Sequence, residues 1–75
     1  MNTNRPEHVL ITDALIYIRE RTGYDFERRQ FTRWIEAGEV LIDGVSQELE
    51  STMVGGRWYI RRESLDLLVG ALNRE

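Results

Sequence analysis

Residues 54 to 68 constrain the fold of this chain more than any other segment. A Gly-Gly pair provides a tight turn, and the residues that follow alternate between polar and apolar, as in a strand with one buried face. A leucine-rich stretch comes next, which predicts an amphipathic helix over residues 62 to 72. The outward strand positions are Arg57 and Tyr59, and the inward ones are Trp58 and Ile60. The sequence therefore predicts a basic hairpin tip held rigidly against a helical core.

Two helices are predicted upstream of this segment. The first starts at Thr12, a suitable N-cap residue, and ends near Thr22 because Gly23 follows. The second is capped by Asp25 and ends at Gly38. Apolar residues recur at helical spacing in both, so each helix is expected to bury one face. These residues are Ile11, Ala14, Leu15 and Ile18 in the first helix and Phe31, Trp34 and Ile35 in the second.

A second hairpin is predicted between the second helix and the Gly-Gly turn. Residues 40 to 42 are apolar and precede Asp43-Gly44, a pair that readily adopts the positive φ angles of a type I′ turn. Residues 1 to 9 are mostly polar and are expected to form a flexible lead-in. A chain of 75 residues leaves room for one α+β domain over residues 10 to 75, with two N-terminal helices, a hairpin region and a C-terminal helix.

Both tryptophans are predicted to belong to the core. Trp34 lies on the apolar face of the second helix, and Trp58 is in phase with Ile60 along its strand. We expect them to share one core, joined by Ile18 and Leu68. Four other apolar residues lie off the buried faces of the first and last helices, which predicts either packing between these helices or self-association and a protein interface. They are Ile16, Tyr17, Leu67 and Ala71.

The residue types argue against catalysis and metal binding. The chain has no cysteine and a single histidine, His8, so neither a disulfide nor a zinc site is expected. It also lacks lysine, which leaves scattered carboxylates as the acid and base candidates in a domain too small for a deep cleft. We expect a protein that is not an enzyme, holds no cofactor, has no membrane segment or leader pattern, and is cytoplasmic.

Charge is unevenly distributed, although the net charge is only −3. All ten basic residues are arginines, whose planar guanidinium groups match phosphate and the guanine edge. Residues 36 to 56 contain five acids and no base, whereas residues 57 to 62 contain three arginines and no acid. Polar residues on the outer side of the second helix and on the last strand are the candidate nucleic-acid contacts. They are Arg28, Arg29, Gln30, Thr32, Arg33, Arg57 and Arg61.

Several short segments together resemble the excisionase and MerR-like family of winged helix-turn-helix proteins. They are Ile11-Thr12, Arg28-Arg29, Trp34-Ile35, Gly38-Glu39-Val40, Gly56-Arg57-Trp58-Tyr59-Ile60 and Arg62-Glu63-Ser64-Leu65. The resemblance covers most of residues 10 to 70. It implies sequence-specific binding of duplex DNA by a small excisionase, which directs recombination, or by a transcription regulator of a phage, plasmid or mobile element. It also implies association of copies on DNA, with a recombinase or another protein as a candidate partner.

Two alternatives remain open at the level of sequence. Residues 28 to 44 are similar to the RNA-binding motif of ribosomal protein S4 and pseudouridine synthases, in which a basic helix precedes a Gly-x-Val-x-Val-Asn-Gly segment. A protein of this kind would bind structured RNA. The acidic stretch of residues 36 to 50 allows a different function, in which the protein is an adaptor that binds a basic protein partner and no nucleic acid.

Overall fold

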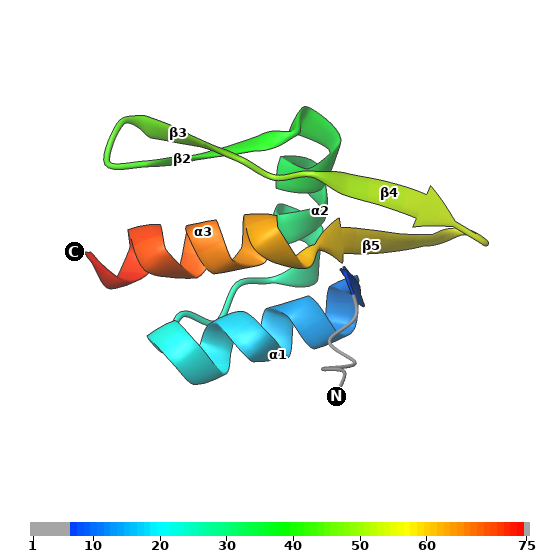
Figure 1. Ribbon diagram of the computed structural model, residues 1–75, viewed down its shortest axis with the longest axis horizontal. Helices are drawn as coiled ribbons and strands as arrows, with labels where there is room; N and C mark the ends of the chain where they lie inside the picture. The colour runs from blue at the N-terminus through cyan, green and yellow to red at the C-terminus, as the bar shows by residue number, and fades with distance from the viewer. Residues whose placement is uncertain (1–6, 75) are drawn as a thin grey trace.

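Three helices and five strands follow one another along residues 7 to 74, the part of the chain that the computed structural model describes (Figure 1). The architecture is α+β with antiparallel sheets, as the sequence predicts. In chain order the elements are β1 (His8–Leu10), α1 (Ile11–Thr22), α2 (Arg28–Ala37), β2 (Glu39–Ile42), β3 (Val45–Glu48), β4 (Ser51–Val54), β5 (Arg57–Arg61) and α3 (Arg62–Asn73).

The strands form two separate antiparallel sheets. One contains three strands in the order β1-β5-β4, and the other is the β2–β3 hairpin. Ile60 lies at the centre of the larger sheet, where it is paired with Val9 on one side and Ser51 on the other. Both predicted hairpins are confirmed, including the turns at Asp43-Gly44 and Gly55-Gly56. All four turn residues have positive φ angles, between 53° and 80°, which is the geometry of a type I′ turn.

Strand β1 was not expected from the sequence. The predicted flexible lead-in covered residues 1 to 9, of which residues 1 to 6 lie outside the described part of the chain. The prediction is wrong for His8 and Val9, because these residues pair with Arg61 and Ile60 of β5. Val9 is also buried in the core. The N-terminal strand therefore ties the start of α1 directly to β5.

The core lies between the helices and the inner faces of the two sheets. Its largest fully buried side chains are Phe31, Ile11, Ile18, Leu49, Ile60, Leu65 and Leu68. The prediction that Trp34 and Trp58 share one core with Ile18 and Leu68 is confirmed in part, because both tryptophans pack against this cluster but are only half-buried. Phe31 rather than either tryptophan is the largest fully buried side chain.

The predicted C-terminal ends of α1 and α2 agree with the structure better than their predicted N-terminal starts do. Gly23 and Gly38 cap α1 and α2 with φ angles of 84° and 82°, as predicted. The predicted N-caps are wrong: the N-cap residues are Leu10 for α1 and Glu27 for α2, and neither makes a side-chain cap hydrogen bond. Strand β1 passes directly into α1, which places Thr12 inside the first turn.

The start of α2 is fixed by aromatic packing instead of by Asp25. Tyr24 stacks on Phe26 at a ring distance of 5.7 Å, and Phe26 meets the edge of Trp34 at 5.0 Å. These contacts anchor the connection between α1 and α2 to the side of α2.

Helices α1 and α3 pack against each other, which accounts for part of the apolar surplus seen in the sequence. The Tyr17 hydroxyl donates a 2.6 Å hydrogen bond to Asp66, and Ala71 is buried. Ile16 and Leu67 remain 44% and 56% exposed, so the expectation that these two mediate self-association stays a prediction. None of the helices in the described part of the chain has the length and apolar character needed to cross a membrane.

Candidate nucleic-acid interface

Helix α2 presents its arginines on two adjacent faces. Arg29 and Arg33 lie one turn apart and point away from Phe31 and Ile35, the two buried residues of the helix. Arg28 lies at the edge of this outer face, on the side of Thr32. The Thr32 hydroxyl donates a 2.8 Å hydrogen bond to the Arg28 carbonyl, so its hydrogen is used within the helix and only its oxygen can accept.

Arg28 and Arg57 come together from distant parts of the chain. They line one cavity of about 280 Å³, together with Leu10, Ile11 and Thr12. Arg28 is the first residue of α2, and Arg57 is the first residue of β5. The cavity therefore lies where the starts of three elements meet, because Ile11 begins α1.

The cavity has the chemistry of an anion site. The first turn of a helix presents backbone N–H groups without intrahelical partners, and the N-cap Leu10 has no side chain that could accept from them. Thr12 adds a hydroxyl group, and the two guanidinium groups add positive charge and forked donors. Asp13 is the one acid in this turn. It does not line the cavity.

The position of Arg57 depends on the β4–β5 turn. Gly55 and Gly56 have φ angles of 59° and 78°, which side chains other than glycine rarely adopt. The turn pairs Arg57 with Val54, so that the arginine lies at the tip of the hairpin. Strand β5 also pairs with β1, which leads into α1, so the base of this hairpin lies beside the start of α1.

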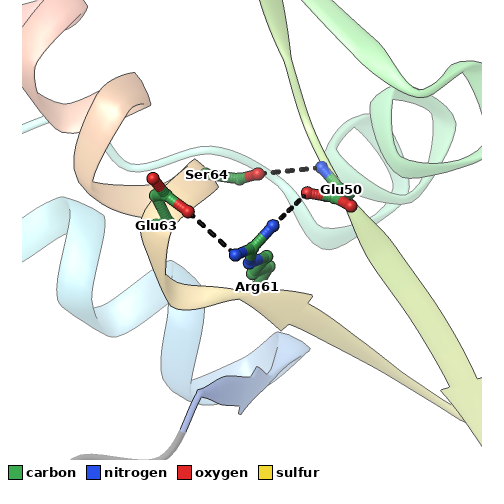
Figure 2. A network of polar contacts seen from close by, with 4 residues as sticks. All are labelled: Glu50, Arg61, Glu63 and Ser64. Carbon is green, nitrogen blue, oxygen red and sulfur yellow. Dashed lines mark hydrogen bonds and ion pairs between the residues drawn. The ribbon is translucent and has the colours of Figure 1, made fainter.

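Arg61 has a different environment from the other candidate arginines. Figure 2 shows its guanidinium group between two carboxylates, with Glu50 at 2.9 Å and Glu63 at 3.0 Å. The hydrogen bond and charge of Glu50, with a further contribution from Glu63, raise the pKa of Arg61. The Ser64 hydroxyl accepts a 3.0 Å hydrogen bond from the Glu50 backbone N–H, which ties the β3–β4 connection to the start of α3. We therefore assign Arg61 to an intramolecular network and leave it out of the interface.

Four arginines remain, which we call the basic surface: Arg28, Arg29, Arg33 and Arg57. Within the described residues, no ion pair joins any of them to a carboxylate. Their charges are therefore available to a ligand. Glu27 is the N-cap residue of α2, and Glu36 lies near the end of the helix. These two acids mark the limits of the basic surface along α2.

Gln30 lies apart from the basic surface. It is one turn before Trp34, on the opposite flank of α2 from Arg28, and both Gln30 and Trp34 line a second cavity beside β2. The sequence grouped Gln30 with the arginines because all are polar residues of one helix. The start of α1 also contributes to the cavity, although it was not among the predicted site residues. The Ile11-Thr12 segment was the part of the sequence that could have indicated it.

The residues from 7 to 74 offer no metal centre, since they contain no group of three histidine, cysteine or acidic side chains placed to hold an ion. Comparisons with protein-family models, with curated proteins and with solved structures found no match. The function of this chain is therefore inferred from its own geometry.

Proposed function

We propose that the protein binds duplex DNA as a winged helix-turn-helix protein, with α2 in the major groove and the β4–β5 hairpin as the wing. The observation that carries the proposal is the cavity in which Arg28 of α2 and Arg57 of β5 meet the first turn of α1. Two distant segments place cations without an ion-pair partner around one space, which the first turn of α1 also lines. A phosphate is the ligand that this combination of groups suits best.

The roles of the four arginines differ in this proposal. Arg28 and Arg57, with Thr12 and the α1 N-terminus, each hold a backbone phosphate and together fix the orientation of the protein on the duplex. Arg29 and Arg33 point outward from α2, where a helix in the major groove would meet base edges and the flanking phosphates. The resemblance to excisionases and MerR-like proteins supports a role as an excisionase or transcription regulator.

A binding titration against duplex DNA at several salt concentrations tests the proposal. Each neutralised phosphate contributes about −0.9 to the slope of log affinity against log salt, so the four arginines predict a slope of roughly −3 to −4. Replacing Arg28 or Arg57 by alanine should make the slope shallower by about one unit on every DNA sequence. Replacing Arg29 by alanine should instead cost about 1 to 3 kcal/mol on a preferred site and relax the sequence preference.

Arg19→Ala is the matched control, because Arg19 is exposed on α1 and is not part of the cavity. It removes the same charge and should leave the slope nearly unchanged. If Arg19→Ala and Arg57→Ala lower the affinity equally, only net charge matters and the cavity is not a phosphate site.

Structured RNA and protein binding are the competing outcomes. An S4-like RNA-binding protein would use the α2 arginines and not Arg57, so structured RNA would outcompete duplex DNA and Arg57→Ala would have no effect. An adaptor would bind neither nucleic acid at physiological salt. Either result, obtained with folded protein and a panel of duplexes, would refute the DNA proposal.

A further inference from the structure

The outer face of α2 carries an acid in line with its two outward arginines. Arg29, Arg33 and Glu36 are spaced four and three residues apart, so they form one row along the helix. All three side chains are exposed, and the row points away from Phe31 and Ile35, which anchor the helix in the core. We call these three residues the outer row.

The carboxylate of Glu36 has no partner among residues 7 to 74. No hydrogen bond or ion pair in that part of the chain involves it, although Arg33 precedes it by three residues on the same face. A ligand that approaches the outer row therefore meets a carboxylate that can accept a hydrogen bond, at the end of a row that otherwise only donates.

The outer row has the length of a few base pairs. An α-helix rises about 1.5 Å per residue, so Glu36 lies about 10 Å from Arg29 along the helix axis. Base pairs in duplex DNA are about 3.4 Å apart, and the major groove is about 12 Å wide, which admits an α-helix. With α2 in this groove, Arg29 and Glu36 would face positions about three base pairs apart.

A carboxylate in the major groove has few favourable partners. Phosphates repel it, and the groove edges of guanine and thymine present oxygen or nitrogen acceptors that cannot donate to it. Adenine offers an amino group beside the N7 acceptor, whereas cytosine offers an amino group as its one polar atom in this groove. Cytosine is therefore the base that Glu36 suits best.

We propose that Glu36 is a base-reading residue that accepts a hydrogen bond from the amino group of a cytosine, while Arg29 donates to a guanine about three base pairs away. This inference rests on the proposed function and extends it, because it names the class of DNA site. In such an arrangement the acid weakens binding to most sequences and strengthens the preference for the site that satisfies it.

Selection of binding sites from a random duplex library on the immobilised full chain tests the inference. We expect enriched sites to share a guanine and a cytosine about three base pairs apart. Anisotropy titrations then compare the best duplex with one in which this C·G pair is replaced by T·A. The replacement should weaken binding of the unmodified protein about tenfold, and Glu36→Ala should reduce that difference to about twofold or less.

Glu20→Ala is the matched control. It removes the same charge from an exposed helix position, and Glu20 lies toward the end of α1 that is remote from the Arg28–Arg57 cavity. The cytosine preference should be unchanged in this variant. If Glu20→Ala and Glu36→Ala raise the affinity for random duplex equally and both keep the cytosine preference, Glu36 acts through net charge alone and the inference is wrong.

The outcomes distinguish this inference from the proposed function. A selection that enriches no duplex refutes DNA binding and the role of Glu36 with it. Enriched sites with adenine or no fixed base at the expected position would overturn the role of Glu36 alone, and so would a cytosine preference that survives Glu36→Ala. Circular dichroism of each variant establishes that it is folded.

Discussion

The two hairpins of this protein have the same turn geometry and opposite surroundings. Both use two residues with positive φ angles, Asp43-Gly44 in one and Gly55-Gly56 in the other. They extend toward opposite ends of the molecule (Figure 1). The β4–β5 hairpin carries Arg57 at its tip, whereas the β2–β3 hairpin carries Asp43 in its turn and Glu39 opposite Glu48.

The hairpins also differ in how they join the rest of the domain. Strand β5 is the middle strand of a three-stranded sheet and places Ile60 fully in the core. The β2–β3 hairpin is a sheet of its own, in which Val40 alone is buried. The two-residue turn therefore determines neither the charge of a hairpin nor its rigidity. Both depend on the strands beside the turn and on how the hairpin packs against the core. The base of the β4–β5 hairpin is held by β1, whereas the β2–β3 hairpin pairs with no third strand.

The largest expected difference between the hairpins is in the free energy of unfolding that an isoleucine-to-alanine substitution removes from each. Ile60→Ala should lower the free energy of unfolding by about 3 to 4 kcal/mol, because it leaves a cavity in the core. Ile42→Ala in β2 should cost about 1 kcal/mol, because that side chain is only half-buried. Chemical denaturation measures both, and equal losses would show that the β2–β3 hairpin is as deeply integrated as β5.

The turns and helix ends were predictable because glycine encodes them locally. Gly38 has a φ angle that few other residues adopt, and so do Gly44 and Gly56. The strand pattern from Arg57 to Ile60 was also readable, since its alternation follows from one buried face. Such features need only a few neighbouring residues, and a single sequence contains them.

Strand β1 and the helix starts were not predictable because they depend on distant residues. Three residues, His8 to Leu10, are too short to show alternation, and their partner β5 lies about fifty residues later in the chain. Thr12 and Asp25 are good N-caps by residue type, but packing of β1 and of the aromatic side chains at Tyr24 and Phe26 sets where α1 and α2 begin.

The same distinction applies to the candidate site. The sequence identified Arg28 and Arg57 separately, and their meeting at the start of α1 is a property of the tertiary structure. Gln30 was grouped with them, although helical geometry places it with Trp34 on the other flank. The network around Arg61 was partly readable, since Glu63 is two residues away, but Glu50 comes from the connection between β3 and β4.

A smaller effect is expected for the two like charges that face each other in the β2–β3 hairpin, Glu39 and Glu48. Glu48→Gln should stabilise the protein slightly, and Glu48→Lys should raise the free energy of unfolding by about 0.5 kcal/mol, because it turns repulsion with Glu39 into attraction. Thermal or chemical denaturation at low salt provides the measurement. In about 1 M salt, where the screening length falls to roughly 3 Å, the gain should largely disappear. A Glu48→Lys variant that is less stable at low salt would mean that the pair does not repel.

The smallest expected effect concerns Arg61, at the base of the same strand that carries Arg57. Arg61 already faces Glu50 and Glu63, and its backbone N–H donates a 2.8 Å hydrogen bond to the Glu50 carbonyl. A phosphate would have to displace carboxylates that are held in place, so Arg61 should release no counterion on binding. Arg61→Gln should then leave the salt slope of DNA binding unchanged, whereas Arg57→Gln should make it shallower by about 0.9. Parallel titrations of the two variants on one duplex give the comparison. A change near 0.9 for Arg61→Gln would show that the arginine leaves its carboxylates for the DNA, and the basic surface would then extend from the tip of β5 to the start of α3.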